Sequence, residues 1–237
     1  MNVVLLTAAG SGTRMHQDIP KQFIHVDNKP VIIYTMEAFQ HHPSIDAIIV
    51  VTIDSWSDVL WAYAKQFNVT KLKWVVPGGA SGQESIRLGL EALRKVLSDG
   101  DVVMVHDGNR PLVSSQVISD NLATFAKYGN AVAAIPCTEV VFESEDGISS
   151  CVSTEREKLF RTQTPHTYRL GDLYNAHLEA EKGNIVGTAA SCMLMKELGK
   201  MTYFSKGSEE NMKITTTDDL KIFKALLHTR QDSWIKD

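Results

Sequence analysis

The sequence predicts an α/β protein with a mostly parallel sheet and helices on both faces. Two observations lead to this prediction. Continuous apolar runs of four to six residues are typical of strands buried on both faces, and segments with a helical period separate them. Strands that alternate with helices in this way form βαβ units, whose strands are parallel. With 43% hydrophobic and 22% charged residues, the 237-residue chain can bury one sizeable core.

The first half of the chain supplies most of these elements. Strands are expected at residues 3–6, 47–52, 72–76 and 102–105. Helices are expected at 30–39, where Pro30 suits a first helical turn, and at 58–67 and 85–96. Sheets of this kind bind ligands at the carboxyl ends of their parallel strands. The residues that follow these strands should therefore meet at one edge.

A β-hairpin interrupts the pattern in the second half. Runs at 138–144 and 148–153 flank a turn at 145–147, and a hairpin inserted in an α/β domain suggests an arm that packs on another surface, such as a second subunit. The remaining elements are expected as helices at 170–180 and 189–198, a strand near 201–205 and a C-terminal helix at 218–228. No repeat or linker divides the chain. We therefore expect one domain, 1–237, with a dimerisation arm at about 137–160.

Composition narrows the functional classes. A net charge of −4 argues against a nucleic-acid-binding surface but allows small anions held by a few local cations. Cys137, Cys151 and Cys192 are odd in number and widely spaced, which disfavours a disulfide framework and a zinc site. No apolar run reaches the roughly 18 residues of a membrane span, and the apolar start does not resemble a signal peptide. A cytoplasmic enzyme without a membrane partner is expected.

Small residues follow the first expected strand in the segment AAGSGTRM, residues 8–15. They let backbone N–H groups approach a polyphosphate, and Arg14 and Lys21 supply positive charge. Walker A spacing is absent, and Met15 stands where the third glycine of a dinucleotide-binding loop would be. The glycines alone fit a tight turn equally well. With Arg14 and PKQF at 20–23, the segment resembles the signature loop of sugar-nucleotide pyrophosphorylases and related nucleotidyltransferases.

A second polar segment, HDGNRP at residues 106–111, closes the fourth expected strand. Asp107 is a candidate Mg²⁺ ligand at that edge, and Arg110 is a candidate bidentate partner of a substrate phosphate. A turn or helix-cap role before Pro111 fits Asp107 equally well.

Five motifs occur in order along nearly the whole chain, from residue 3 to about residue 227: AAGSGTRM, PKQF, HDGNRP, RTQTPHTY and NMKITTTDDL. Together they resemble the cytidylyltransferases that act on 2-C-methyl-D-erythritol 4-phosphate or on ribitol 5-phosphate. The resemblance implies a Rossmann-like domain whose β-arm clasps a second subunit in a homodimer. It also implies transfer of CMP from CTP to the acceptor phosphate, with Mg²⁺ as cofactor and pyrophosphate as product. Because a phosphate monoester is already a nucleophile at neutral pH, catalysis needs only positioning and charge neutralisation, without a covalent intermediate or a strong general base.

The resemblance also implies roles for individual residues. The catalytic set is Arg14, Lys21, Asp107 (also the metal ligand) and Lys213. The CTP pocket comprises Ala8, Ala9, Gly10, Ser11, Gly12, Gly78, Gly79 and Ser85. The acceptor side comprises Arg110, Arg156, Thr164 and Val140, with Arg156 and Thr164 reaching into the neighbouring subunit's site. Without the resemblance, Arg156 fits a solvated arm residue and Lys213 a surface lysine.

The chain departs from the family pattern mainly on the acceptor and dimer side. Glu139-Val140 stands where Asp-Thr is usual, and Phe142 where methylerythritol-phosphate enzymes carry a lysine. Gly82 replaces an arginine, and Gly187-Thr188 replaces Thr-Asp. These changes put the acceptor in doubt more than the reaction.

Ribitol 5-phosphate is the favoured acceptor, because Trp56, the run 142–144 and KITTTDDLKIF resemble the ribitol-phosphate branch. Three alternatives stay open: methylerythritol phosphate as the acceptor, another polyol or sugar phosphate, and a nucleotide-binding homologue without turnover. A pyrophosphorylase for UTP or dTTP is disfavoured by the short length and the PKQF motif.

Overall fold

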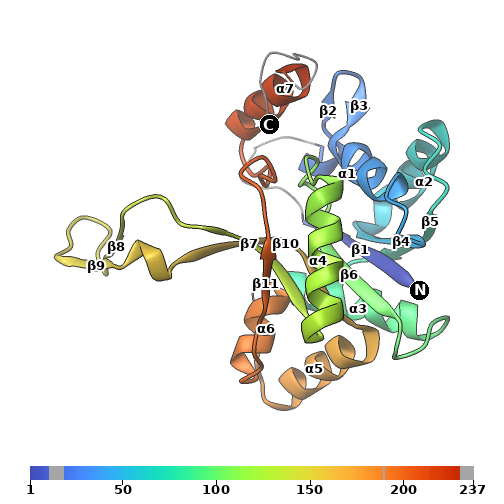
Figure 1. The fold of residues 1–237 in the computed structure, drawn as a ribbon. Helices are drawn as coiled ribbons and strands as arrows, with labels where there is room; N and C mark the ends of the chain where they lie inside the picture. Colours follow the sequence, from blue (N-terminus) through green and yellow to red (C-terminus); the bar gives the residue numbers. More distant parts are fainter. Residues whose placement is uncertain (11–18, 189, 230–237) are drawn as a thin grey trace.

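The structure is a computed structural model that describes residues 1–10, 19–188 and 190–229 (Figure 1). Its centre is a seven-stranded sheet with the order β11-β7-β10-β6-β1-β4-β5. The four predicted parallel strands are present as neighbours: β1 (Asn2–Ala8), β4 (Ala47–Thr52), β5 (Leu72–Pro77) and β6 (Val102–Asp107). Their register aligns the carboxyl ends, because Thr7 pairs with Asp107, Ala8 with Thr52, and Thr52 with Pro77. The expected common edge is therefore confirmed.

The other half of the sheet contains two strands that the apolar pattern did not predict. These are β7 (Ala131–Pro136) and β10 (Phe160–Arg169), and β10 runs antiparallel between β6 and β7. The last strand, β11 (Phe204–Lys206), pairs parallel with β7 and begins slightly later than predicted. β10 was missed because its buried stretch is polar: Gln163, Thr164, His166 and Thr167 are all buried. A strand whose buried face carries polar side chains gives no hydrophobic alternation.

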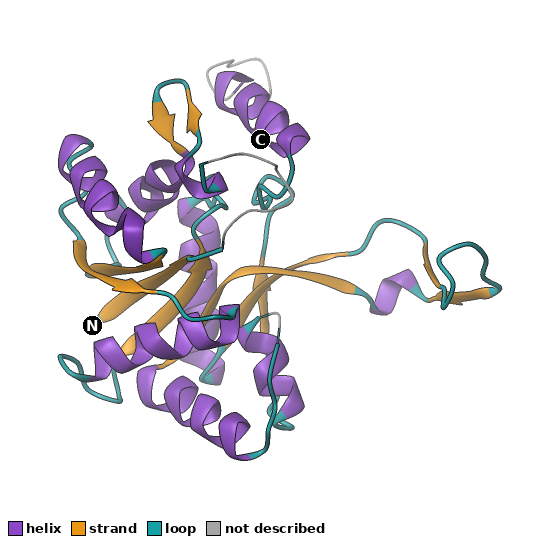
Figure 2. Ribbon diagram, turned by 180° about the vertical axis from the view of Figure 1, so that it is seen from behind, coloured by secondary structure: helices purple, strands orange, loops and turns teal. Residues whose placement is uncertain are grey.

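Helices cover both faces of the sheet, as predicted (Figure 2). One face packs on α1 (Val31–Gln40), α2 (Ser57–Gln66) and α4 (Ser115–Tyr128), the last of which was not predicted. The other face packs on α3 (Gly82–Arg94), α5 (Leu170–Lys182) and α6 (Ser191–Glu197). Alternate residues of β1 supply the two cores, with Val4 and Leu6 on the first face and Val3 and Leu5 on the second.

Two appendages leave this body. The predicted hairpin is present as β8 (Val141–Glu143) and β9 (Val152–Thr154), followed by a short 3-10 helix, Arg156–Lys158, on an arm that projects from the sheet (Figure 1). The C-terminal helix α7 (Thr217–Thr229) packs through Phe223 against Tyr34 of α1 and near the hairpin β2 (His25–Val26) and β3 (Lys29–Pro30). Among the described residues, no helix combines the length and apolarity needed to cross a membrane.

Candidate active site

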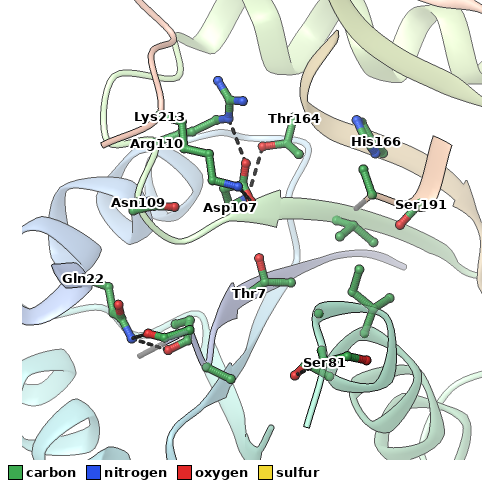
Figure 3. Close-up of a pocket in the computed structure, with 18 of the residues that line it drawn as sticks. Thr7, Gln22, Ser81, Asp107, Asn109, Arg110, Thr164, His166, Ser191 and Lys213 are labelled. Carbon is green, nitrogen blue, oxygen red and sulfur yellow. Dashed lines mark hydrogen bonds and ion pairs between the residues drawn. The ribbon is translucent and has the colours of Figure 1, made fainter. Parts of the chain in front are cut away.

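A cavity of about 470 Å³ opens at the carboxyl ends of the parallel strands (Figure 3). It brings together segments that lie far apart in the sequence. The predicted site residues that line it are Ala8, Ala9, Gly10, Lys21, Gly79, Ser85, Asp107, Arg110, Thr164 and Lys213. The predicted residues Ser11, Gly12 and Arg14 lie outside the described residues.

The loop after β1 is fixed at its base by a residue that the sequence analysis did not single out. Gln22 lies in a short 3-10 helix, Lys21–Phe23, and its side chain is buried. The side-chain amide donates to the carbonyl oxygens of Ala8 and, at 3.3 Å, of Gly10. Gln22 therefore ties the start of the glycine-rich loop to the segment that carries Lys21. Gln22 is part of the motif PKQF, but its hydrogen bonds to the loop become visible only in the folded structure.

The start of α3 forms a second wall of the cavity. Ser81 caps the helix by accepting a hydrogen bond from the Glu84 backbone N–H at 3.1 Å, which explains why the helix begins at Gly82 rather than at the predicted Ser85. The Ser85 hydroxyl accepts from the Gly79 N–H at 3.1 Å and donates to the Ser81 carbonyl at 2.8 Å. Ser85 thus shapes the turn that faces the cavity.

Gly78 does not line the cavity as expected but lies behind it. A Cβ atom at this position would come within 2.2 Å of the Ala9 Cβ and 3.1 Å of the Ser85 Oγ. Gly78 is therefore needed for the close approach of the loop after β5 to the loop after β1.

Asp107, Arg110 and Lys213 form a charged cluster at the end of β6 (Figure 3). The Lys213 Nζ lies 2.9 Å from Oδ1 of Asp107, and the Arg110 Nε donates to Oδ2 at 2.9 Å. Burial alone would raise the pKa of Asp107, but the two cations outweigh it and hold the pKa well below its usual range. The carboxylate is thus ionised at neutral pH, and the cluster keeps one net positive charge.

Backbone and amide contacts hold this cluster in place. The Thr164 hydroxyl accepts from the Asp107 N–H at 3.0 Å, which links β10 to β6. Arg110 also donates to the Asn211 carbonyl at 2.6 Å, and the Asn211 amide donates to the Thr164 carbonyl at 2.8 Å. The segment that carries Lys213 is therefore anchored to β10. Asn211 opens the motif NMKITTTDDL but was not singled out as a site residue, because its role depends on the backbone groups that it meets after folding.

Two predicted acceptor-side residues lie on the arm and do not line this cavity. Arg156 is half exposed and pairs with Glu157 at 3.1 Å, while Val140 is exposed. Their expected role in a neighbouring subunit's site stays a prediction.

The chain is similar to known proteins over nearly its whole length. The family model described as 2-C-methyl-D-erythritol 4-phosphate cytidylyltransferase (IspD) matches residues 2–229. The chain is 41% identical to a ribitol-5-phosphate cytidylyltransferase of Lacticaseibacillus paracasei, over 98% of this chain and 100% of that protein. It is 37% identical to a 2-C-methyl-D-erythritol 4-phosphate cytidylyltransferase of Clostridium acetobutylicum, over 96% and 97% of the two chains.

Solved structures show the same fold. The crystal structure of 4-diphosphocytidyl-2C-methyl-D-erythritol synthase from Anaerococcus prevotii matches with a TM-score of 0.81 over 96% of both chains, at 23% identity. The fold is thus shared with this solved structure, and the family model and the sequence relatives belong to one group of transferases. The chain therefore belongs to the IspD family of cytidylyltransferases.

Proposed function

We propose that the chain transfers CMP from CTP to a polyol phosphate, with ribitol 5-phosphate as the favoured acceptor. The observation that carries this proposal is the Lys213–Asp107–Arg110 cluster, which shares one cavity with the glycine-rich loop. A site that joins two phosphorylated substrates needs cations on both sides of the reacting phosphorus. Lys21 lies at the loop, and Arg110 and Lys213 lie at the cluster.

In this mechanism the loop after β1 and the start of α3 hold the nucleotide. Backbone N–H groups at Ala9 and Gly10, together with Lys21, bind the triphosphate, and the turn shaped by Ser85 receives the cytidine. Arg110 and Lys213 hold the acceptor phosphate. A phosphate oxygen of the acceptor forms a bond to the α-phosphorus while the bond from the α-phosphorus to the bridging oxygen breaks. Pyrophosphate leaves with that electron pair, and the cations neutralise its charge.

A Mg²⁺ ion fits this arrangement through Asp107. Magnesium in nucleotide sites prefers oxygen ligands and uses one or two carboxylates together with substrate phosphates. Asp107 stays ionised at the cavity wall, and its two oxygens are held by Lys213 and Arg110. Among the described residues no cluster of three or more His, Cys, Asp or Glu offers a cage, so most ligands would come from the triphosphate and water. When bound, Mg²⁺ would polarise the phosphates of CTP.

The choice of acceptor rests on the relatives and on the altered arm. Relatives named ribitol-5-phosphate cytidylyltransferases reach 41% identity, and one named for methylerythritol phosphate reaches 37%. Phe142 stands where methylerythritol-phosphate enzymes usually carry a lysine, and Val140 stands where the family usually carries a threonine. Methylerythritol phosphate is the second candidate acceptor.

A homodimer is part of the proposal. The arm exposes large apolar side chains, with Phe142 58% and Ile148 90% exposed. An exposed apolar hairpin on a soluble body is typical of an interaction surface, and a second copy of the chain would cover it.

The direct test is pyrophosphate release from CTP and Mg²⁺ with ribitol 5-phosphate and 2-C-methyl-D-erythritol 4-phosphate supplied in parallel. Rapid release with ribitol 5-phosphate is expected. Release with methylerythritol phosphate alone would show that this compound, and not ribitol 5-phosphate, is the acceptor. CTP binding without pyrophosphate release for either acceptor would contradict the proposed transfer.

A further inference from the structure

Two polar side chains in the cavity have no hydrogen-bond partner among the described residues. His166 on β10 and Ser191 at the start of α6 both line the cavity, and each is only 2% exposed. Both ring nitrogens of His166 and the Ser191 Oγ are buried without a partner in the part of the chain that the structure describes. Buried polar groups normally have partners, so such atoms in the wall of a binding cavity point to a ligand.

The two side chains belong to one wall of the cavity. His166 pairs with Val105 on β6, two residues before Asp107, and β-strand alternation places Val105 and Asp107 on the same face. Close by, Tyr168 of β10 belongs to the same buried cluster as Leu194 and Met195 of α6. The start of α6 therefore lies against the stretch of β10 that holds His166. Figure 3 shows His166 and Ser191 at the end of the view opposite Gln22.

The chemistry of this wall differs from that of the cation cluster. Burial lowers the pKa of His166 to about 4 and outweighs Asp107 and the Gln163 backbone, which favour the protonated ring, so the ring is neutral at neutral pH. Neither ring nitrogen has a hydrogen-bond partner among the described residues, so both stay available to a ligand. A neutral imidazole offers one donor and one acceptor, and so does a serine hydroxyl. The matching ligand group is an uncharged hydroxyl, which both donates and accepts.

We propose that His166 and Ser191 form a hydroxyl-binding subsite that holds the sugar-alcohol chain of the acceptor and discriminates between polyol phosphates. The proposal rests on the transfer reaction proposed above. Arg110 and Lys213 bind the acceptor phosphate, and both lie close enough to His166 to influence its charge. The carbon chain that extends from that phosphate therefore reaches the His166 wall. The ribose of CTP also carries hydroxyls, and the experiment separates the two sources.

The experiment compares steady-state kinetics of the full-length enzyme and its variants with CTP, Mg²⁺ and ribitol 5-phosphate. Ser191→Ala removes one oxygen atom, and His166→Phe keeps a ring but removes both polar nitrogens. Each is expected to raise KM for ribitol 5-phosphate about five- to tenfold, the loss typical of one neutral hydrogen bond, while KM for CTP changes less than about twofold. His166→Asn, whose amide keeps a donor and an acceptor, should restore most of the affinity.

The chain offers a matched control in His177. This histidine is 3% exposed, its Nε2 has no partner among the described residues, and burial lowers its pKa to about 4, but it lies outside the cavity. His177→Phe should leave both KM values unchanged. A deoxy analogue of ribitol 5-phosphate that lacks the contacted hydroxyl should bind the wild type weakly and lose little more in Ser191→Ala.

The outcomes separate this subsite from the transfer reaction itself. If the wild type transfers CMP to ribitol 5-phosphate but Ser191→Ala and His166→Phe keep its KM, the subsite proposal is wrong and the transfer stands. A rise in KM for CTP alone would assign the wall to ribose and overturn the acceptor assignment. If His166→Phe does not fold, Ser191→Ala with the deoxy analogue decides. Absence of transfer by the wild type would overturn both the reaction and the subsite.

Discussion

At the scale of single residues, the ionisation of Asp107 controls what the cavity attracts. Lys213 and Arg110 each contact one of its oxygens at 2.9 Å, and together they keep the carboxylate charged despite burial. The carboxylate leaves one cationic charge uncompensated at the acceptor side. Lys21 is a further positively charged residue that lines the cavity, at the loop. In the proposed transfer these cations would face the negative charge that develops on the phosphates, and preorganised charges of this kind act mainly on the transition state.

Replacement of Lys21 should therefore impair turnover more than binding. Lys21→Ala is expected to lower kcat for pyrophosphate release by about 10²- to 10³-fold, the range typical of one lost transition-state contact. Circular dichroism and the thermal midpoint should stay close to wild type, because Lys21 is only partly buried. Lys73→Ala on the exposed side of β5 is the matched control and should retain full turnover. A Lys21→Ala enzyme with near-normal kcat would remove Lys21 from the catalytic set.

The roles of charged residues in recognised motifs could be predicted from the sequence. The roles of the uncharged polar residues that support them could not. Asp107, Arg110 and Lys213 were predicted through HDGNRP and NMKITTTDDL, and the structure brings all three together. Gln22 and His166 also stood inside recognised motifs. Their contribution depends on which atoms they face after burial, and a linear pattern does not contain that information.

At the scale of elements, the start of α3 and the segment before α6 are joined by one side chain. The Gln83 amide donates to the Ile185 carbonyl at 2.8 Å, and its oxygen accepts from the Thr188 N–H at 3.0 Å and the Thr188 hydroxyl at 3.1 Å. Gly82 and Thr188 are two of the positions at which this chain departs from the family pattern. Gln83 thus connects these two segments, and it holds the loop between α5 and α6 that leads to Ser191.

Loss of this connection should loosen the segment without unfolding α3. Gln83→Ala is expected to speed hydrogen exchange at the Thr188 amide and to lower the free energy of unfolding by about 1–3 kcal/mol, the range for the lost hydrogen bonds. α3 should remain, because Ser81 still caps it. Gln66→Ala, at the exposed end of α2, is the control. Unchanged exchange at Thr188 would show that the segment is held by other contacts.

The arm provides a separate prediction at this scale. In the proposed dimer, Phe142 on β8 is covered by a second copy, so Phe142→Asp should convert the dimer into a monomer in analytical ultracentrifugation. The fold should persist, because Phe142 is 58% exposed in the single chain. Val96→Asp, a similarly exposed residue away from the arm, should stay dimeric. A wild-type enzyme that sediments as a fully active monomer would refute the dimer.

Shared sites can be tested in the same dimer through Arg156. Lys21→Ala and Arg156→Ala subunits should each be impaired, but a heterodimer contains one site in which both residues are intact. Random mixing should therefore restore about a quarter of wild-type activity if the arm acts across the interface. If demonstrated heterodimers show no recovery, Arg156 does not serve the neighbouring site.

The elements also show where hydrophobic periodicity stops being informative. The strands β1, β4 and β6 were predicted because they are buried on both faces and read as apolar runs. β5, at the edge of the sheet, is only partly buried but still carries the apolar run 74–76. Part of β10 is buried as well, but its buried contacts are polar. Asn121 of α4 forms hydrogen bonds with Thr167 and the Pro165 carbonyl of β10, and also with Ser205 of β11. α4 and β7 were missed as well, because no element was predicted between residue 111 and the arm at about 137.

At the scale of the whole molecule, buried histidines should make the fold sensitive to mild acid. Burial lowers the pKa of His106 to about 3 and of His166 and His177 to about 4. The same groups titrate near 6.5 in an unfolded chain, so between pH 6.5 and about 4 the unfolded state binds protons that the folded state does not. Stability is therefore complete above pH 6.5 and is lost as the pH falls through this window. Asp107, whose pKa is depressed, loses its contribution only at lower pH.

The size of this effect is measurable. Each fully neutral buried histidine should lower the free energy of unfolding by about 2 kcal/mol between pH 7 and pH 5, so three of them would remove about 6 kcal/mol from a typical total of 5–15 kcal/mol. Urea unfolding of the wild type and of His177→Gln at both pH values checks this. His177→Gln should reduce the loss on acidification by about 2 kcal/mol, whereas His41→Gln, at an exposed position, should not. Equal losses in all three proteins would mean that His177 gains its proton in the folded state, and that acid sensitivity arises elsewhere.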